Sequence, residues 1–167
     1  NNIGLSANFG FPISSKLNFT GNVLTNYRKG DAAGFYRYPK QTGQVILELY
    51  PDGFLPHILT TVRDRSYMFA IDGDYKGWKW DLGNSYGLNS IGFDINNTNN
   101  ASQFAMGKNA QTSFYAGQLY FRQNTLNFNT SKDFGKNLNL KSFNVGLGAE
   151  ARWEKYKINP GEESSYR

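Results

Sequence analysis

Side chains suited to catalysis or metal binding are few and scattered in this chain. His57 is the only histidine, and the 167 residues include no cysteine. A general base or metal ligand at His57 would therefore have no second imidazole or thiolate beside it in the sequence. Phosphate-binding loops of the forms G-x-x-x-x-G-K-[ST] and G-x-G-x-x-G are also absent. The sequence therefore predicts a protein that is not an enzyme, with no cofactor and no metal site.

Three aspartates lie close together around one predicted turn. Asp72 and Asp74 lie two residues apart before the turn, and Asp81 follows it. Carboxylates at such spacing could bind calcium, but the glycine and glutamate of an EF-hand loop are missing. We therefore interpret these residues as a solvated turn.

A second cluster combines cations with aromatic rings. The cations are Arg28, Lys29, Arg37 and Lys40, and the rings belong to Tyr27, Phe35, Tyr36 and Tyr38. A nucleic-acid surface fits this pattern only loosely, and we expect no nucleic-acid partner. The favoured interpretation is a membrane interface, where cations meet lipid phosphates and rings lie at headgroup level. The alternative is capture of an anionic ligand by the outer-loop residues Arg28, Tyr36, Arg37 and Tyr38.

Composition limits the fold that positions these residues. The chain is 39% hydrophobic, 16% aromatic and 19% charged, with 18 glycines and a net charge of +5. No run approaches the ~18 apolar residues of a membrane helix, which excludes an α-helical membrane protein. Abundant aromatic residues and modest charge argue against disorder. Aromatic residues with turn-forming Gly and Asn favour β-structure, and a β-barrel with alternating faces can be polar on average and still lie in a bilayer.

Apolar and polar residues alternate with a period of two along six segments, which predicts six antiparallel strands. The segments are 3–11, 17–27, 62–72, 78–88, 115–128 and 143–153. In the fifth, the phase changes near Gln123 and Asn124, which predicts a bulge. Tight turns are predicted near residues 14, 76 and 136, and long loops at about 29–60, 95–112 and 158–167. Short turns at one end and long loops at the other are typical of an outer-membrane barrel.

The two sets of alternating residues predict two different surroundings. Glu150, Arg152 and Glu154 share one face, where contact with lipid would be costly, so we expect them to line a wet lumen. Aromatic residues near the segment ends are predicted to form girdles at the membrane interfaces. They are Tyr27, Trp78, Trp80, Trp153 and Tyr156. A half-buried aromatic face in a soluble β-sheet is the alternative.

Three stretches carry a family resemblance: YRKGDAAGFYR at 27–37, WKWDLGNSYG at 78–87 with the Asn-rich loop after it, and FNVGLGAEARWEKY at 143–156 continuing into PGEESSYR. They resemble the barrel of TonB-dependent receptors of the Bacteroidota type. The resemblance covers nearly the whole chain. It implies a 22-stranded transmembrane β-barrel with an N-terminal plug and a TonB-box, neither of which we find here. Residues 1–167 are therefore expected to be part of one barrel domain, about six strands of a larger wall.

The resemblance also implies a function. Such a receptor lies in the outer membrane of a Gram-negative bacterium, binds a scarce solute with its outer loops and imports it into the periplasm. The implied partners are outer-membrane lipid, TonB acting through the rest of the receptor, and the remaining barrel segments or other chains of a complex. The solute is not identified. Two alternatives remain open: a self-contained small outer-membrane barrel or surface binding module, and a soluble all-β carbohydrate-binding domain.

Overall fold

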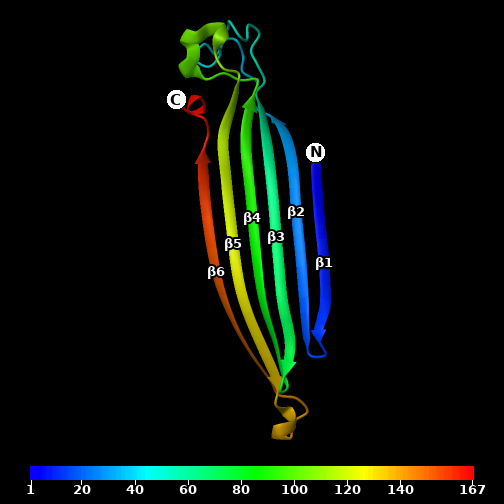
Figure 1. Ribbon diagram of the computed structural model, residues 1–167. Helices are drawn as coiled ribbons and strands as arrows, with labels where there is room; N and C mark the ends of the chain where they lie inside the picture. Colours follow the sequence, from blue (N-terminus) through cyan, green and yellow to red (C-terminus); the bar gives the residue numbers. More distant parts are fainter.

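The chain forms a single antiparallel sheet of six long strands (Figure 1). The structure is a computed structural model that describes residues 1–167. Its strands are β1 (Asn2–Ser14), β2 (Leu17–Ala33), β3 (His57–Tyr75), β4 (Trp78–Asn96), β5 (Ser113–Asp133) and β6 (Asn144–Pro160). Each strand pairs with the next one in the sequence, and the sheet is not closed, because β1 and β6 have one neighbour each. The predicted all-β fold with six antiparallel strands is confirmed.

Short 3-10 helices occur only between or after the strands. They are η1 (Ala101–Asn109), η2 (Gly135–Leu138) and η3 (Glu163–Ser165). None of the helices has the length and apolar character needed to cross a membrane.

The strand register gives the sheet two chemically different faces. Partners across strands share a face, as Phe9 does with Gly21, Gly21 with Phe69, and Phe69 with Asn84. We call one side the aromatic face. It carries the odd-numbered residues of β1, β2, β3 and β6, and the even-numbered residues of β4 and of β5 from residue 118. We call the other side the polar face.

Three connections lie at the lower end of the sheet in Figure 1, close to the predicted positions. The first two are two-residue turns at Ser15–Lys16 and Lys76–Gly77. Lys76 and Gly77 have φ angles of 51° and 77°, the left-handed conformation that a tight hairpin turn requires. The third connection, 134–143, contains η2 and is longer than the predicted tight turn.

The loops at the upper end are shorter than predicted, since β2 and β3 extend beyond their apolar parts. Lys29–Ala33 pair in unbroken register with His57–Thr61. The first loop is therefore 34–56 rather than 29–60, and Arg28 and Lys29 belong to a strand. The other two loops are 97–112 and 161–167. His57, which falls within the predicted loop 29–60, instead begins β3, and its Nδ1 lies 2.9 Å from Oδ1 of Asp31.

The bulge predicted near Gln123 and Asn124 is wrong. β5 stays in register with β4 from Gln118 to Ser131, and the register shifts instead between Phe93 and Asp94. The hydrophobic phase changes because the two faces exchange character towards the loops: Leu119 and Phe121 lie on the polar face. β5 therefore keeps its regular alternation of side chains, and only the face that carries its apolar residues changes towards the loops.

The sheet encloses almost no interior. Only six hydrophobic residues are buried, and three of them, Val45, Ile46 and Phe54, belong to the first loop. Large hydrophobic side chains along every strand remain exposed instead. The hydrophobic core of this chain therefore lies among its loops, not beneath its sheet.

Candidate functional site

The three upper loops fold together into one unit, the loop lobe, made of residues 34–56, 97–112 and 161–167. Asn99 joins the first two loops: its Oδ1 accepts from the Ile46 N–H at 3.2 Å, and its amide donates to the Gln44 carbonyl at 3.0 Å. The Glu48 carboxylate accepts from the Lys108 N–H at 3.1 Å. Polar side chains thus satisfy backbone groups that the loops leave without strand partners.

The third loop is attached by the same chemistry. The Asn100 amide donates to the carbonyls of Ser164 and Arg167 at 2.9 and 2.8 Å. Oε1 of Glu162 accepts from the Gln111 amide and from the Tyr115 N–H, both at 2.8 Å. The sequence indicated a polar loop here but not this structural role, because a run of asparagines does not specify which backbone groups they will meet.

A small apolar core supports the lobe. Val45 and Ile46 are buried there, and the rings of Tyr50 and Phe54 lie 4.5 Å apart between centroids. The Tyr50 hydroxyl donates to the Thr98 carbonyl at 3.2 Å, and burial raises the pKa of this phenol. The lobe is therefore a packed unit rather than a set of independent loops.

The lobe carries three of the four residues predicted to bind a ligand. The rings of Tyr36 and Tyr38 lie edge to face at 5.2 Å, and the Tyr36 hydroxyl donates to the Asp52 carbonyl at 2.8 Å. Arg37 lies between them and pairs through its backbone with Phe54. The fourth residue, Arg28, lies on the polar face of β2, beside Val62, and not in a loop.

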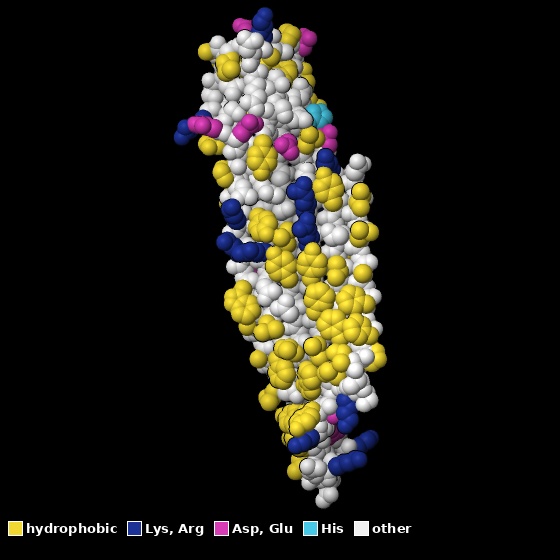
Figure 2. Space-filling view, viewed as in Figure 1, with side chains coloured by type: hydrophobic (Ala, Val, Ile, Leu, Met, Phe, Trp, Pro, Cys, Tyr) yellow, Lys and Arg dark blue, Asp and Glu magenta, His cyan; other side chains and the backbone are white.

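An apolar belt crosses the lower part of the aromatic face (Figure 2). We define the belt as the aromatic-face residues of 5–13, 17–27, 67–75, 78–88, 124–130 and 145–153. Its rings contact one another across strands: Phe19 and Phe69 stack at 6.1 Å, and Phe9 lies 6.1 Å from Phe19. No other layer of the chain covers it.

Two asparagines interrupt the belt, and their side-chain amides are hydrogen-bonded to each other. Asn84 and Asn124 exchange side-chain hydrogen bonds of 3.2 and 3.3 Å, and Asn84 also donates to the Thr125 carbonyl at 3.2 Å. A polar group without a partner is costly in apolar surroundings. These reciprocal hydrogen bonds lower the cost of placing two amide side chains at the centre of an apolar surface.

Four of the five predicted interface aromatics lie on the aromatic face. Trp78 and Trp80 are at its lower end, Tyr27 is at the upper end of the belt, and Trp153 is 57% exposed at the upper end on β6. Tyr156 lies on the polar face instead, directly opposite Phe121. Its parity is that of Glu154, so Tyr156 and Trp153 lie on opposite faces of β6.

The polar face carries the predicted charged residues of β6. Arg152 Nη2 lies 2.8 Å from Glu150 Oε1, and its Nη1 lies 3.9 Å from Glu154 Oε1. All three side chains are about half exposed. The row is therefore ion-paired within one strand, with one cation between two carboxylates.

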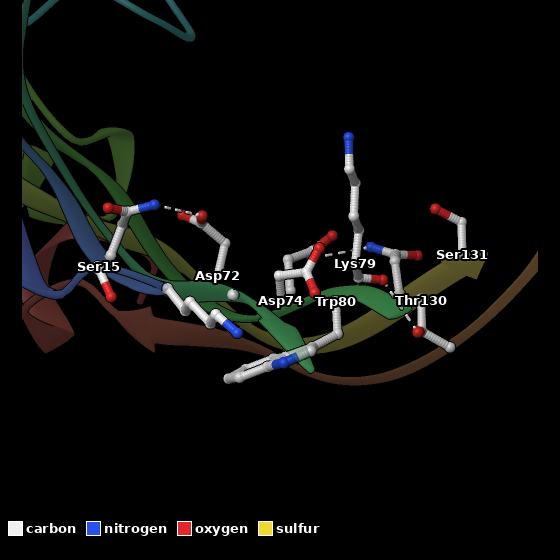
Figure 3. A pocket seen from close by; sticks show the side chains of 12 residues that line it. Ser15, Asp72, Asp74, Lys79, Trp80, Thr130 and Ser131 are labelled. Atoms are coloured by element: carbon white, nitrogen blue, oxygen red, sulfur yellow. Dashed lines mark hydrogen bonds between the residues drawn. The ribbon is translucent and has the colours of Figure 1, made fainter. Parts of the chain in front are cut away.

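The aspartates near residue 76 border an open pocket of about 470 Å³ at the lower end of the polar face (Figure 3). Asp72 accepts from the Asn18 amide at 2.9 Å, and Asp81 accepts from the Asn129 amide at 3.0 Å. Figure 3 also shows Lys79 and the Trp80 indole pointing to opposite sides of the strand. No group of three or more acidic or histidine side chains is placed to hold a metal ion. The pocket is a hydrogen-bonded polar surface.

Asp133, the last residue of β5, lies beyond the belt and organises the connection 134–143. Its carboxylate accepts from the N–H groups of Phe143 and Gly135 at 2.9 and 2.7 Å, and from the Ser142 hydroxyl at 2.7 Å. These three donors hold the pKa of Asp133 below its usual range. The ionised form is therefore the one that the folded connection prefers.

We expect this connection to loosen in acid. A depressed folded-state pKa contributes stability that is present above the unfolded value of about 3.9 and is lost as pH falls through the folded value. The protection factors of the Phe143 and Gly135 amides, which correct for the intrinsic pH dependence of hydrogen exchange, should fall in that pH window. Asp133→Asn should produce the same loss of protection at neutral pH, while Asp52→Asn, whose carboxylate makes no hydrogen bond, should not. Unchanged exchange in Asp133→Asn would show that the carboxylate does not hold the connection.

Comparison of the chain with protein-family models, with curated proteins and with solved structures gives no match.

Proposed function

We propose that this chain forms part of the wall and outer loops of a larger outer-membrane β-barrel, of the TonB-dependent receptor type, that imports a scarce solute. The observation that carries the proposal is the uncovered apolar belt on one face of a sheet whose other face is polar. A soluble monomer rarely exposes a continuous apolar patch beyond a few hundred Å². In a membrane barrel, lipid would cover the apolar belt and water would solvate the polar face.

The height of the belt supports this proposal. Its apolar span occupies about 9 to 11 positions on β2, β3, β4 and β6, as in 17–27 and 67–75. A strand tilted in a bilayer needs ~9–11 residues to cross the hydrocarbon. The strands themselves continue further towards the loops, where both faces become polar or mixed.

The open edges require further strands under this proposal. β1 and β6 each leave one edge without a ladder partner. Unpaired backbone groups in hydrocarbon cost several kcal/mol each, which is why membrane sheets close. We therefore propose that other barrel strands flank β1 and β6.

The loop lobe would present the binding surface. Phe35 is 86% exposed, and Tyr36 and Tyr38 lie beside it on the same segment. Rigid aromatic side chains give large contact area at low entropic cost, and the packed lobe beneath them keeps the segment ordered. These rings, together with Arg37, are the proposed contacts for the solute.

The test uses the absence of cysteine from the chain. Single cysteines at Ala70 and Ile71, and at Glu150 and Ala151, are spin-labelled in native membranes and probed with oxygen and with a water-soluble nickel chelate. We expect Ile71 and Ala151 to collide mainly with oxygen, and Ala70 and Glu150 mainly with nickel. Equal nickel access at all four positions, or recovery of the protein in the aqueous fraction without detergent, would overturn the proposal.

Orientation is tested with the same chemistry on intact cells. A membrane-impermeant maleimide should label Lys40→Cys in the lobe without lysis and Lys136→Cys in the lower connection only after lysis. The reverse pattern would place the lobe in the periplasm and remove its role in capturing external solute.

A further inference from the structure

A cluster of cations lies immediately above the belt, on the same face. It consists of Arg63 and Arg65 on β3, Arg122 on β5, and Lys155 and Lys157 on β6. We call these five residues the cation band. Figure 2 shows cations between the apolar belt below and carboxylates above. The pattern could have been found by parity, because Arg63 and Arg65 continue the alternation of Tyr67 and Phe69.

The band is not neutralised within the chain. None of its members forms an ion pair within 4.0 Å; the ion pairs present involve His57, Arg152 and Arg167. Arg122 lies directly opposite Lys155 in the register, and like charges in that position destabilise a sheet. An external anion bound between them would relieve this repulsion.

The band also has shape and hydrogen-bonding groups. It lines a shallow groove of about 490 Å³ together with Ser90, Gln118, Tyr120 and Asn159. These hydroxyl and amide groups suit a sugar headgroup. Directly below the groove the sheet surface is apolar, and Tyr67 and Trp153 form the top of the belt there. The acyl chains of a lipid whose headgroup lay in the groove would rest on this apolar surface.

The cations form two groups separated by β4. Arg63 and Arg65 lie on one side, and Arg122, Lys155 and Lys157 on the other, with Leu88 and Ser90 between them. Two to three strand spacings of ~4.8 Å separate the groups by roughly 10–14 Å. Phosphates at the two ends of one headgroup can each meet one group, whereas a single phosphate would have to draw the long side chains of both groups together across β4.

We propose that the cation band binds a glycolipid whose sugar headgroup carries two phosphates, with its acyl chains lying against the belt. The inference rests on the proposed function, because it needs the belt in a membrane. It adds a lipid site that the predicted ligand residues Arg28 and Arg37 do not include. Charge-assisted contacts from guanidinium and ammonium groups are the strong interactions for phosphate.

The first test compares probes on the unmodified protein. Purified protein in detergent is titrated with a disaccharide lipid carrying two phosphates, the same lipid with one phosphate, phosphatidylglycerol, and inorganic phosphate, and bound lipid is counted by native mass spectrometry. We expect the bisphosphorylated lipid to bind at least about tenfold more tightly than the others. Equal affinity for phosphatidylglycerol would overturn the assignment.

The second test removes charge. Each cation near a membrane surface contributes about 1 kcal/mol, or roughly fivefold, to binding an anionic lipid. The variant Arg63→Gln/Arg65→Gln/Lys155→Gln/Lys157→Gln should therefore lose at least about 100-fold in affinity. The control Lys136→Gln/Lys141→Gln, in the lower connection, should lose none, and Arg63→Lys/Arg65→Lys should keep most of it.

The two proposals fail in different ways. Equal binding by the fourfold variant and the control, with alternating oxygen and nickel access intact at Ala70 and Ile71, would overturn the lipid site alone. Loss of that alternation in the unmodified protein would overturn the proposed function first.

Discussion

Replacing Phe69 with arginine is expected to lower the free energy of unfolding of the membrane-embedded protein by roughly 2–4 kcal/mol. Phe69 lies near the middle of the belt on β3 and is 40% exposed. A cation there would meet hydrocarbon if the proposed function is correct. The measurement is reversible denaturation of the protein in lipid vesicles, followed by tryptophan fluorescence.

Met68→Arg is the matched control. Met68 is the neighbouring residue, is apolar and 48% exposed, but faces the polar side. Its replacement should cost less than about 1 kcal/mol, as for a surface substitution. Phe69→Ala corrects for the lost ring contacts with Phe9 and Phe19. If Phe69→Arg, so corrected, costs no more than Met68→Arg, the belt does not face lipid.

Gly117→Ala is expected to destabilise the upper end of β5 by at least about 1–3 kcal/mol. Gly117 has a φ angle of +108° at the register shift opposite Phe93. A Cβ there would lie 2.7 Å from the Asn159 carbonyl oxygen. The strain should spread to the third loop, since the Glu162 N–H donates to the Tyr115 carbonyl at 2.9 Å. Faster amide exchange at Glu162 and a lower denaturation midpoint would report it.

The control for this substitution is Gly87→Ala. A Cβ on Gly87 meets no atom within 4 Å, and its φ angle is not positive. Alanine also has less backbone freedom to lose than glycine, so this change should be neutral or slightly stabilising. Equal costs at the two positions would mean that Gly117 adopts a conformation open to any residue.

The sequence by itself determined the strands. Alternation with a period of two along segments such as 17–27 and 143–153 can be recognised locally, because neighbouring side chains of a strand point to opposite faces. The six strands and their antiparallel order follow from such segments and the short turns between them. The face of Glu150, Arg152 and Glu154 was predictable for the same reason.

Only the tertiary structure decided which residues of different strands are level with one another. The phase change at Gln123 and Asn124 was misinterpreted as a bulge because a single strand does not reveal that both faces change character at the same height. The cation band likewise spans three strands that are distant in the sequence, and the roles of Asn99 and Asn100 depend on loops more than 50 residues away. Local chemistry sets the pleat of each strand, whereas the register, a property of pairs of strands, determines which charges and hydrogen-bonding groups meet.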